Sequence, residues 1–225
     1  MLTDFLNLCF PKVCYACNAL LGDNEQFACT NCRHQFPVTN FHFNNDDSVL
    51  KVFYGRLPVQ HATALFRFEK KGMVQQLIHN LKYRGFEEVG TFLGAWLGTE
   101  LKQIPAYQTV DVVIPVPLHK NKLRKRGYNQ VTKFGQEIAK SLEANFTDDV
   151  LIKVSNTSSQ VTKNRITRWL NNSEIFKATN LNKIAGKHVL LVDDIITTGA
   201  TMEACGTVLL KNNNLKISVA AMAIA

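Results

Sequence analysis

The fold is decided by Val189-Leu-Leu-Val-Asp-Asp-Ile-Ile-Thr-Thr-Gly-Ala-Thr-Met202. Its leading apolar residues, Val189 to Val192, predict a strand buried on both faces. Two acids, Asp193 and Asp194, follow at the predicted carboxyl end of that strand. A small, hydroxyl-rich turn comes next, and after it the apolar residues Met202, Cys205, Val208 and Leu209 recur at helical spacing. The order strand, acid pair, turn and helix indicates an α/β fold.

This order suits a phosphate group beside a diol. The turn places backbone N–H groups and threonine hydroxyls at a helix N-terminus, where anions are stabilised. Asp193 and Asp194 could accept hydrogen bonds from vicinal hydroxyls or hold Mg2+. Phosphate next to a diol describes a ribose 5-phosphate. A solvated strand end is the usual alternative for two acids alone, but it leaves the run Thr197–Thr201 unexplained.

Four cysteines near the N-terminus form two pairs, Cys14-Tyr-Ala-Cys17 and Cys29-Thr-Asn-Cys32. Two such pairs can bring four thiolates to one Zn2+, and a complete set of four protein ligands is typical of a structural site. The alternative, a redox CxxC, is expected singly and near a βαβ pattern. We therefore predict a structural zinc that stabilises a segment too poor in apolar residues to fold unaided.

The length of 225 residues fits one medium domain with a small module, or two small domains. We place the zinc module and a connector at residues 1–50 and the larger domain at 51–225. The net charge of +8 suggests a polyanionic partner such as phosphates or nucleic acid. No basic n-region opens the chain, and no apolar run approaches the ~20 residues of a membrane helix. We predict a cytoplasmic protein without stable disulfides.

Basic residues concentrate in two places. Lys82 and Arg84 fall in the last turn of a predicted helix, where cations also complement the helix dipole in a purely structural role. The second group directly follows a predicted strand at 110–114 and contains Lys120, Lys122, Arg124, Lys125 and Arg126. Position and density favour an anion site over a solvated basic loop. Phosphate, pyrophosphate and single-stranded nucleic acid all fit.

Periodicity predicts the remaining elements. Strands are expected at residues 63–68, 150–154 and 216–225, with a short one at 52–54, and helices at 73–85, 92–101 and 131–142. The polar, basic stretch 155–173 is predicted to be a lid, with a disordered linker as the alternative. Trp169-Leu170 favours a segment that can pack.

The motifs together resemble the ComF family, whose best-known members are the ComFC competence proteins and GntX. Besides the paired CxxC, the resemblance rests on Leu81-Lys-Tyr-Arg-Gly85, Val116-Pro-Leu-His119, Arg124-Lys-Arg-Gly-Tyr-Asn-Gln130, the spaced Thr157, Gln160, Arg168 and Asn171, and Val192–Thr201. The last block resembles the ribose-phosphate motif of type I phosphoribosyltransferases, which use phosphoribosyl pyrophosphate (PRPP). Where the family often has Pro-Pro before the first cysteine pair, this chain has Phe10-Pro11-Lys12.

The resemblance implies an N-terminal zinc module followed by a type I phosphoribosyltransferase fold, a parallel sheet flanked by helices. It implies PRPP or a related ribose phosphate as ligand, with Mg2+. It also implies a role in natural transformation, through handling of incoming single-stranded DNA. A ComFA-type helicase and a DprA-type DNA-loading protein are the partners that it suggests.

Residue roles carry over onto the matching positions. By this resemblance, Asp193 and Asp194 are expected to hold the ribose hydroxyls, and the 5-phosphate is expected to bind Thr197, Thr198, Gly199, Ala200 and Thr201. Lys82, Arg84 and the basic residues of 120–126 become candidates for pyrophosphate or DNA. The segment that carries Gln160 and Arg168 would close over the ligand.

Turnover of PRPP is left open by the sequence. Displacement of pyrophosphate needs no covalent nucleophile, because Mg2+ and basic groups stabilise the leaving group. The sequence shows no pocket for an acceptor base, however. The alternatives are a phosphoribosyltransferase of nucleotide or small-molecule metabolism unrelated to DNA uptake, a binding protein that uses the fold for recognition, and a zinc-stabilised scaffold with a vestigial site.

Overall fold

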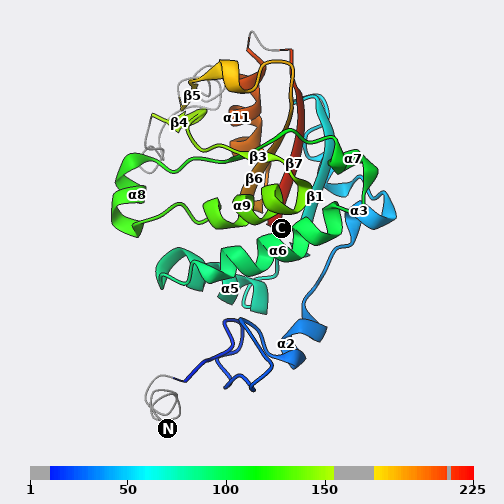
Figure 1. The fold of residues 1–225 in the computed structure, drawn as a ribbon. Helices are drawn as coiled ribbons and strands as arrows, with labels where there is room; N and C mark the ends of the chain where they lie inside the picture. The colour runs from blue at the N-terminus through cyan, green and yellow to red at the C-terminus, as the bar shows by residue number, and fades with distance from the viewer. Residues whose placement is uncertain (1–10, 155–174, 212–213) are drawn as a thin grey trace.

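The computed structural model describes residues 11–154, 175–211 and 214–225. Its centre is a five-stranded sheet in the order β1, β7, β6, β2, β3, with helices on both faces (Figure 1). All four neighbouring pairs are parallel. The strands are β1 (Val59–Arg67), β7 (Lys216–Ile224), β6 (His188–Ile196), β2 (Val112–Pro115) and β3 (Asn145–Phe146). The predicted α/β architecture with a parallel sheet is confirmed.

Strand β6 lies in the middle of the sheet and is buried on both faces. Leu190 and Val192 pack into one hydrophobic core, while Val189 and Leu191 pack into the other. The acids were predicted to lie at the carboxyl end of this strand, but the strand continues two residues beyond them, to Ile196. It continues because the long neighbour β7 pairs with it as far as Ile196.

The helices form two layers. One face of the sheet is covered by α5 (Met73–Tyr83), α6 (Glu88–Leu101) and α9 (Thr132–Leu142). The other face is covered by α11 (Ala200–Leu210), α4 (Ser48–Lys51) and the antiparallel pair of β4 (Leu151–Lys153) and β5 (Phe176–Ala178). The smaller elements are α2 (Thr30–Gln35), α3 (Phe41–Asn44), α7 (Pro105–Gln108), α8 (Lys120–Arg126) and a 3-10 turn at Leu181–Lys183. No helix of the described segments is long and apolar enough to cross a membrane.

Two local predictions are wrong. The expected strand at 52–54 is a series of turns after α4. The basic stretch at 120–126, where no helix was predicted, forms α8. Its N-cap His119 accepts a hydrogen bond from the Asn121 N–H, and it ends at Gly127 with φ 87°. Lysine and arginine are good helix formers. Local propensity and the two caps therefore override the charge repulsion.

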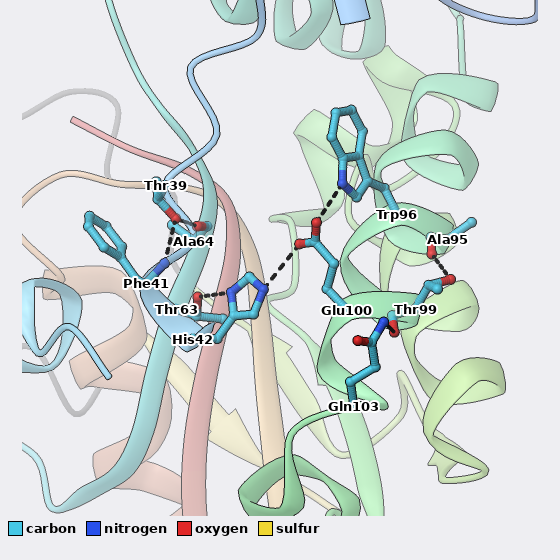
Figure 2. Close-up of polar contacts among 10 residues, drawn as sticks. All are labelled: Thr39, Phe41, His42, Thr63, Ala64, Ala95, Trp96, Thr99, Glu100 and Gln103. Carbon is cyan, nitrogen blue, oxygen red and sulfur yellow. Dashed lines mark hydrogen bonds and ion pairs between the residues drawn. The ribbon is translucent and has the colours of Figure 1, made fainter. Parts of the chain in front are cut away.

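Connector helix α3 is tied to the larger domain by a buried polar cluster (Figure 2). His42 Nδ1 shares a hydrogen bond of 3.0 Å with the Thr63 hydroxyl of β1. Its Nε2 lies 3.1 Å from a carboxylate oxygen of Glu100 on α6. The other oxygen of Glu100 accepts a hydrogen bond of 2.8 Å from Trp96 Nε1. The cluster thus joins α3, β1 and α6. The domain boundary near residue 50 stays a prediction.

Helices α6 and α9 approach each other closely because α6 carries a glycine at every fourth position. These are Gly90, Gly94 and Gly98, all buried. A Cβ on Gly94 would lie 2.5 Å from the Phe134 carbonyl oxygen of α9. A Cβ on Gly98 would lie 2.6 Å from the Ser141 hydroxyl oxygen. The apolar periodicity that predicted a helix at 92–101 gave no indication of this contact.

The Gly94→Ala variant should therefore unfold more easily. Alanine favours a helix by about 1 kcal/mol over glycine, but here its methyl group meets a backbone carbonyl that cannot rotate away. We expect a net loss of about 1–3 kcal/mol in the free energy of unfolding, measured by urea titration. Gly90→Ala is the matched control, because its Cβ would meet nothing closer than 3.4 Å. Equal stability of the two variants would contradict the close α6–α9 contact.

Candidate functional site

The turn between β6 and α11 encloses a small cavity. Residues Thr197, Thr198 and Gly199 form the turn, and α11 begins at Ala200. The cavity of about 30 Å³ is lined by Asp193, Ile195 and residues 196–202. Among the described residues, the N–H groups of the turn donate no hydrogen bond to another backbone group. Free N–H donors at a helix N-terminus suit an anion.

Gly199 fixes the shape of this turn. Its φ of 70° lies in the left-handed region, and an added Cβ would lie 2.7 Å from Val52 Cγ1. Arg56 braces the turn from the same side, because its guanidinium donates to the Thr198 carbonyl at 2.7 Å and pairs with Glu203 of α11. The turns at 52–56, predicted in part as a strand, therefore support the loop.

Asp194 interacts with residues from both basic stretches, the one that contains Lys82 and the one that contains Arg126. Its Oδ2 accepts a hydrogen bond of 2.6 Å from Gln130 Nε2 and lies 2.8 Å from Lys82 Nζ. Buried Gln130 accepts a hydrogen bond from the Arg126 guanidinium through its own Oε1. The carbon of that guanidinium lies 5.6 Å from the ring centre of Tyr83. The ends of α5 and α8 are thus connected to Asp194.

Asp193 has different surroundings. Its Oδ1 accepts a hydrogen bond of 2.8 Å from the Asp194 N–H. Burial raises the pKa of Asp193 to about 8, the charge of Asp194 adds to the rise, and Lys82 and Lys153 oppose it. This rise favours the protonated form of Asp193 at neutral pH. A divalent cation at this position would displace that proton, and the hydroxyls of a diol would favour the ionised carboxylate by donating hydrogen bonds to it.

The other predicted cations are distributed differently. Arg84 lines a separate hollow of about 370 Å³ between α5 and the N-terminal module, together with Ala16 and Asn18. Lys120, Lys122, Arg124 and Lys125 are exposed on α8, which buries none of its residues. Gln160 and Arg168 lie outside the described residues.

Three residues near the acid pair were not predicted as site residues. Gln130 and Arg56 contact the acid pair and the turn directly, as described above. The third, Lys153, has a pKa lowered first by burial and then by the charge of Lys122, while Asp193 raises it. Gln130 belongs to the motif that runs from Arg124 to Gln130, but no sequence signal indicated Arg56 or Lys153.

The four paired cysteines form one cluster. Their sulfur atoms all lie within 4.8 Å of one another, and those of Cys17 and Cys29 are 3.8 Å apart. Zn–S bonds of about 2.3 Å give a tetrahedron whose edges are about 3.8 Å. Burial opposes ionisation of Cys14, but backbone N–H donors, led by that of Cys29, outweigh it and lower its pKa to about 7. The geometry fits a tetrahedral thiolate site that could hold zinc.

Comparison with known proteins agrees with this arrangement. Residues 132–225 match the family Phosphoribosyl transferase domain. "Competence protein ComFC" of Bacillus subtilis is 27% identical over 202 residues, covering 89% of this chain and 78% of the relative. "Competence protein F" of Haemophilus influenzae is 24% identical over 198 residues, with coverages of 88% and 78%.

"DNA utilization protein YhgH" of Escherichia coli K12 is 26% identical over 147 residues, which cover 64% of this chain. The matched part spans 63% of the length of that relative. The domain match and these relatives support the ComF family for this chain, with a phosphoribosyltransferase fold in its larger domain.

Proposed function

We propose that the chain binds PRPP, or a related ribose phosphate, together with Mg2+ at the end of β6. The observation that carries this proposal is a buried acid pair next to a turn of N–H donors and hydroxyls at the start of α11. In this arrangement the turn residues Thr197–Thr201 hold the 5-phosphate. Asp193 and Asp194 face the ribose hydroxyls.

We assign the pyrophosphate to Lys82 and Arg126. Lys82 already contacts Asp194, and Arg126 reaches it through Gln130. Bound Mg2+ would neutralise part of the charge on a leaving pyrophosphate. The side chains of this site orient the ribose and balance the phosphate charges, and none of them has to act as a nucleophile.

We further propose that the protein acts in natural transformation by handling incoming single-stranded DNA. Support comes from relatives named for competence and for DNA utilization, and from the exposed cations of α8. A ComFA-type helicase and a DprA-type protein are its proposed partners, and the cytoplasm its proposed compartment. The cysteine cluster is proposed to hold a structural Zn2+.

Phosphorus NMR of PRPP and Mg2+ with the purified protein tests the ligand. We expect shifted or broadened PRPP lines, and loss of the effect in the Asp193→Ala, Asp194→Ala double variant. Free pyrophosphate that grows with time only in the unaltered protein would identify an enzyme and direct attention to its acceptor. A spectrum that matches PRPP alone would contradict the proposed ligand.

The same variant separates ligand binding from DNA binding. If DNA binds independently of the ribose-phosphate site, removal of the Asp194 charge and of the protonated Asp193 should leave the affinity for single-stranded DNA unchanged or raise it. Measured by fluorescence anisotropy with labelled oligonucleotide, a loss of DNA affinity that parallels the loss of PRPP would instead place the DNA in the ribose-phosphate site. The Asp148→Asn variant, which alters an exposed acid after β3, controls for charge alone.

A further inference from the structure

The N-terminal module and α6 enclose a groove of about 650 Å³ that lies outside the ribose-phosphate site. This volume falls within the range of about 300–1,000 Å³ that is typical of ligand pockets. Phe27 comes from the module, whereas Phe92 and Trp96 come from α6. All three rings are only partly buried. Two segments far apart in the sequence thus form an open aromatic surface.

The three rings form a continuous row. The ring centres of Phe27 and Phe92 are 5.7 Å apart with planes 28° from parallel. Those of Phe92 and Trp96 are also 5.7 Å apart. On the module side the row continues through Tyr15, which stacks on Phe86 at 4.8 Å. Proteins that bind single-stranded nucleic acids present partly exposed aromatic rings on which bases stack, because every base has a π-face.

The charge of the groove matches the same kind of ligand. Its lining includes Arg33 and His34 and, among these described residues, no acidic side chain. The guanidinium carbon of Arg33 lies 5.3 Å from the Phe92 ring centre, and one of its nitrogens donates to the Gln26 carbonyl at 3.1 Å. Its position is therefore fixed, while further N–H donors can meet a phosphate. The nearby acid Glu25 accepts hydrogen bonds from Gly22 and Thr30.

We propose that this groove binds a segment of single-stranded DNA, with bases on Phe92 and Trp96 and a phosphate on Arg33. The proposal rests on the DNA-handling part of the proposed function and gives it a site. It also gives the N-terminal module a role, because the module supplies one wall of the groove. Asn80 of α5 holds that wall in place through a hydrogen bond of 2.7 Å to the Tyr15 carbonyl.

Trp96 makes a direct test possible. The chain contains two tryptophans, so a Trp169→Phe background leaves Trp96 as the single reporter. Titration with an oligothymidine of about 20 nucleotides should quench Trp96 emission, while anisotropy of a labelled oligonucleotide reports overall affinity. We expect Phe92→Leu, which keeps an apolar side chain but removes the ring, to weaken DNA binding roughly 10-fold.

Arg33→Gln should weaken binding and reduce the slope of log affinity against log salt by about 0.7, the value for one phosphate contact with a single strand. Arg33 is exposed, so this variant does not depend on the packing of the core. Two controls lie outside the groove: Phe43→Leu removes an exposed ring on α3, and Lys216→Gln removes an exposed cation at the start of β7. Neither should change the affinity.

The outcomes separate this proposal from the proposed function. DNA binding without quenching of Trp96, and unaffected by Phe92→Leu and Arg33→Gln, would overturn the groove but leave DNA handling intact. Absence of oligonucleotide binding by the unaltered protein would overturn both. If an apolar dye changes Trp96 emission and oligothymidine does not, the groove binds a protein or another apolar ligand and our proposal is wrong.

Discussion

The Asp193→Asn variant is expected to be more stable than the unaltered protein at pH 8, while losing affinity for Mg2+ and PRPP. Asp193 is buried, and burial together with the charge of Asp194 raises its pKa from 3.8 to about 8. The folded protein therefore keeps a proton on Asp193 between about pH 4 and pH 8, where the unfolded chain has released it.

The direction of the pH effect follows from this difference in bound protons. Because the folded state binds more protons in this window, the contribution of Asp193 to stability falls as the pH rises from about 4 to about 8. Each pH unit of the window corresponds to at most about 1.4 kcal/mol. Asparagine resembles the protonated carboxyl, can still accept the Asp194 N–H, and does not ionise.

We expect a gain of about 2 kcal/mol at pH 8, seen as a rise in Tm of roughly 4–8 °C for a protein of this size. At pH 4 the two proteins should differ little. The measurement is thermal unfolding by calorimetry across this pH range, with Asp148→Asn as the control for loss of an exposed acid. If Asp193→Asn and the unaltered protein show the same pH dependence, Asp193 is not a protonated buried acid. A substitution that stabilises the fold and abolishes ligand binding identifies a residue that serves function at the expense of stability.

The central strands could be predicted because burial on both faces leaves a simple signal. The apolar runs at 110–114, 189–192 and 216–225 correspond to β2, β6 and β7. The short strands β3 and β5 carry no such signal, since edge strands of two or three residues take their structure from their neighbours. Strand β4 was predicted, but its position outside the main sheet depends on its pairing with β5.

In the site, too, residues that are neighbours in the sequence could be predicted, and contacts between distant residues could not. The acid pair and the turn are contiguous in the sequence, so their chemistry could be read directly from it. Their supports come from elsewhere: Gln130 is 64 residues from Asp194, and Arg56 is 142 residues from Thr198. Such contacts arise from how helices pack on the sheet. A single sequence gives no measure of them.

Removing the metal from the cysteine cluster should have the largest effect on the N-terminal module. Between residues 12 and 36, all of which the structure describes, the buried residues are Cys14, Ala16, Ala28, Cys32 and Phe36. Structural zinc contributes about 10–16 kcal/mol in small zinc-binding peptides, which exceeds what so small a core can supply. We therefore expect residues 12–36 to lose their structure on metal removal, while the sheet of the larger domain persists.

Cys17→Ser is the sharpest variant for this test, because Cys17 is exposed and its replacement costs little packing. The expected results are one Zn2+ per unaltered chain, and affinity for the metal lowered by more than about 100-fold in the variant. Hydrogen exchange should become fast at residues 12–36 and stay slow in β6 and β7. Cys205→Ser, at a buried cysteine of α11 outside the cluster, is the control for loss of a thiol and should keep the metal. A Cys17→Ser chain with unchanged zinc content would contradict the four-cysteine site. Because the module forms one wall of the aromatic groove, loss of the metal should also lower the affinity for single-stranded DNA.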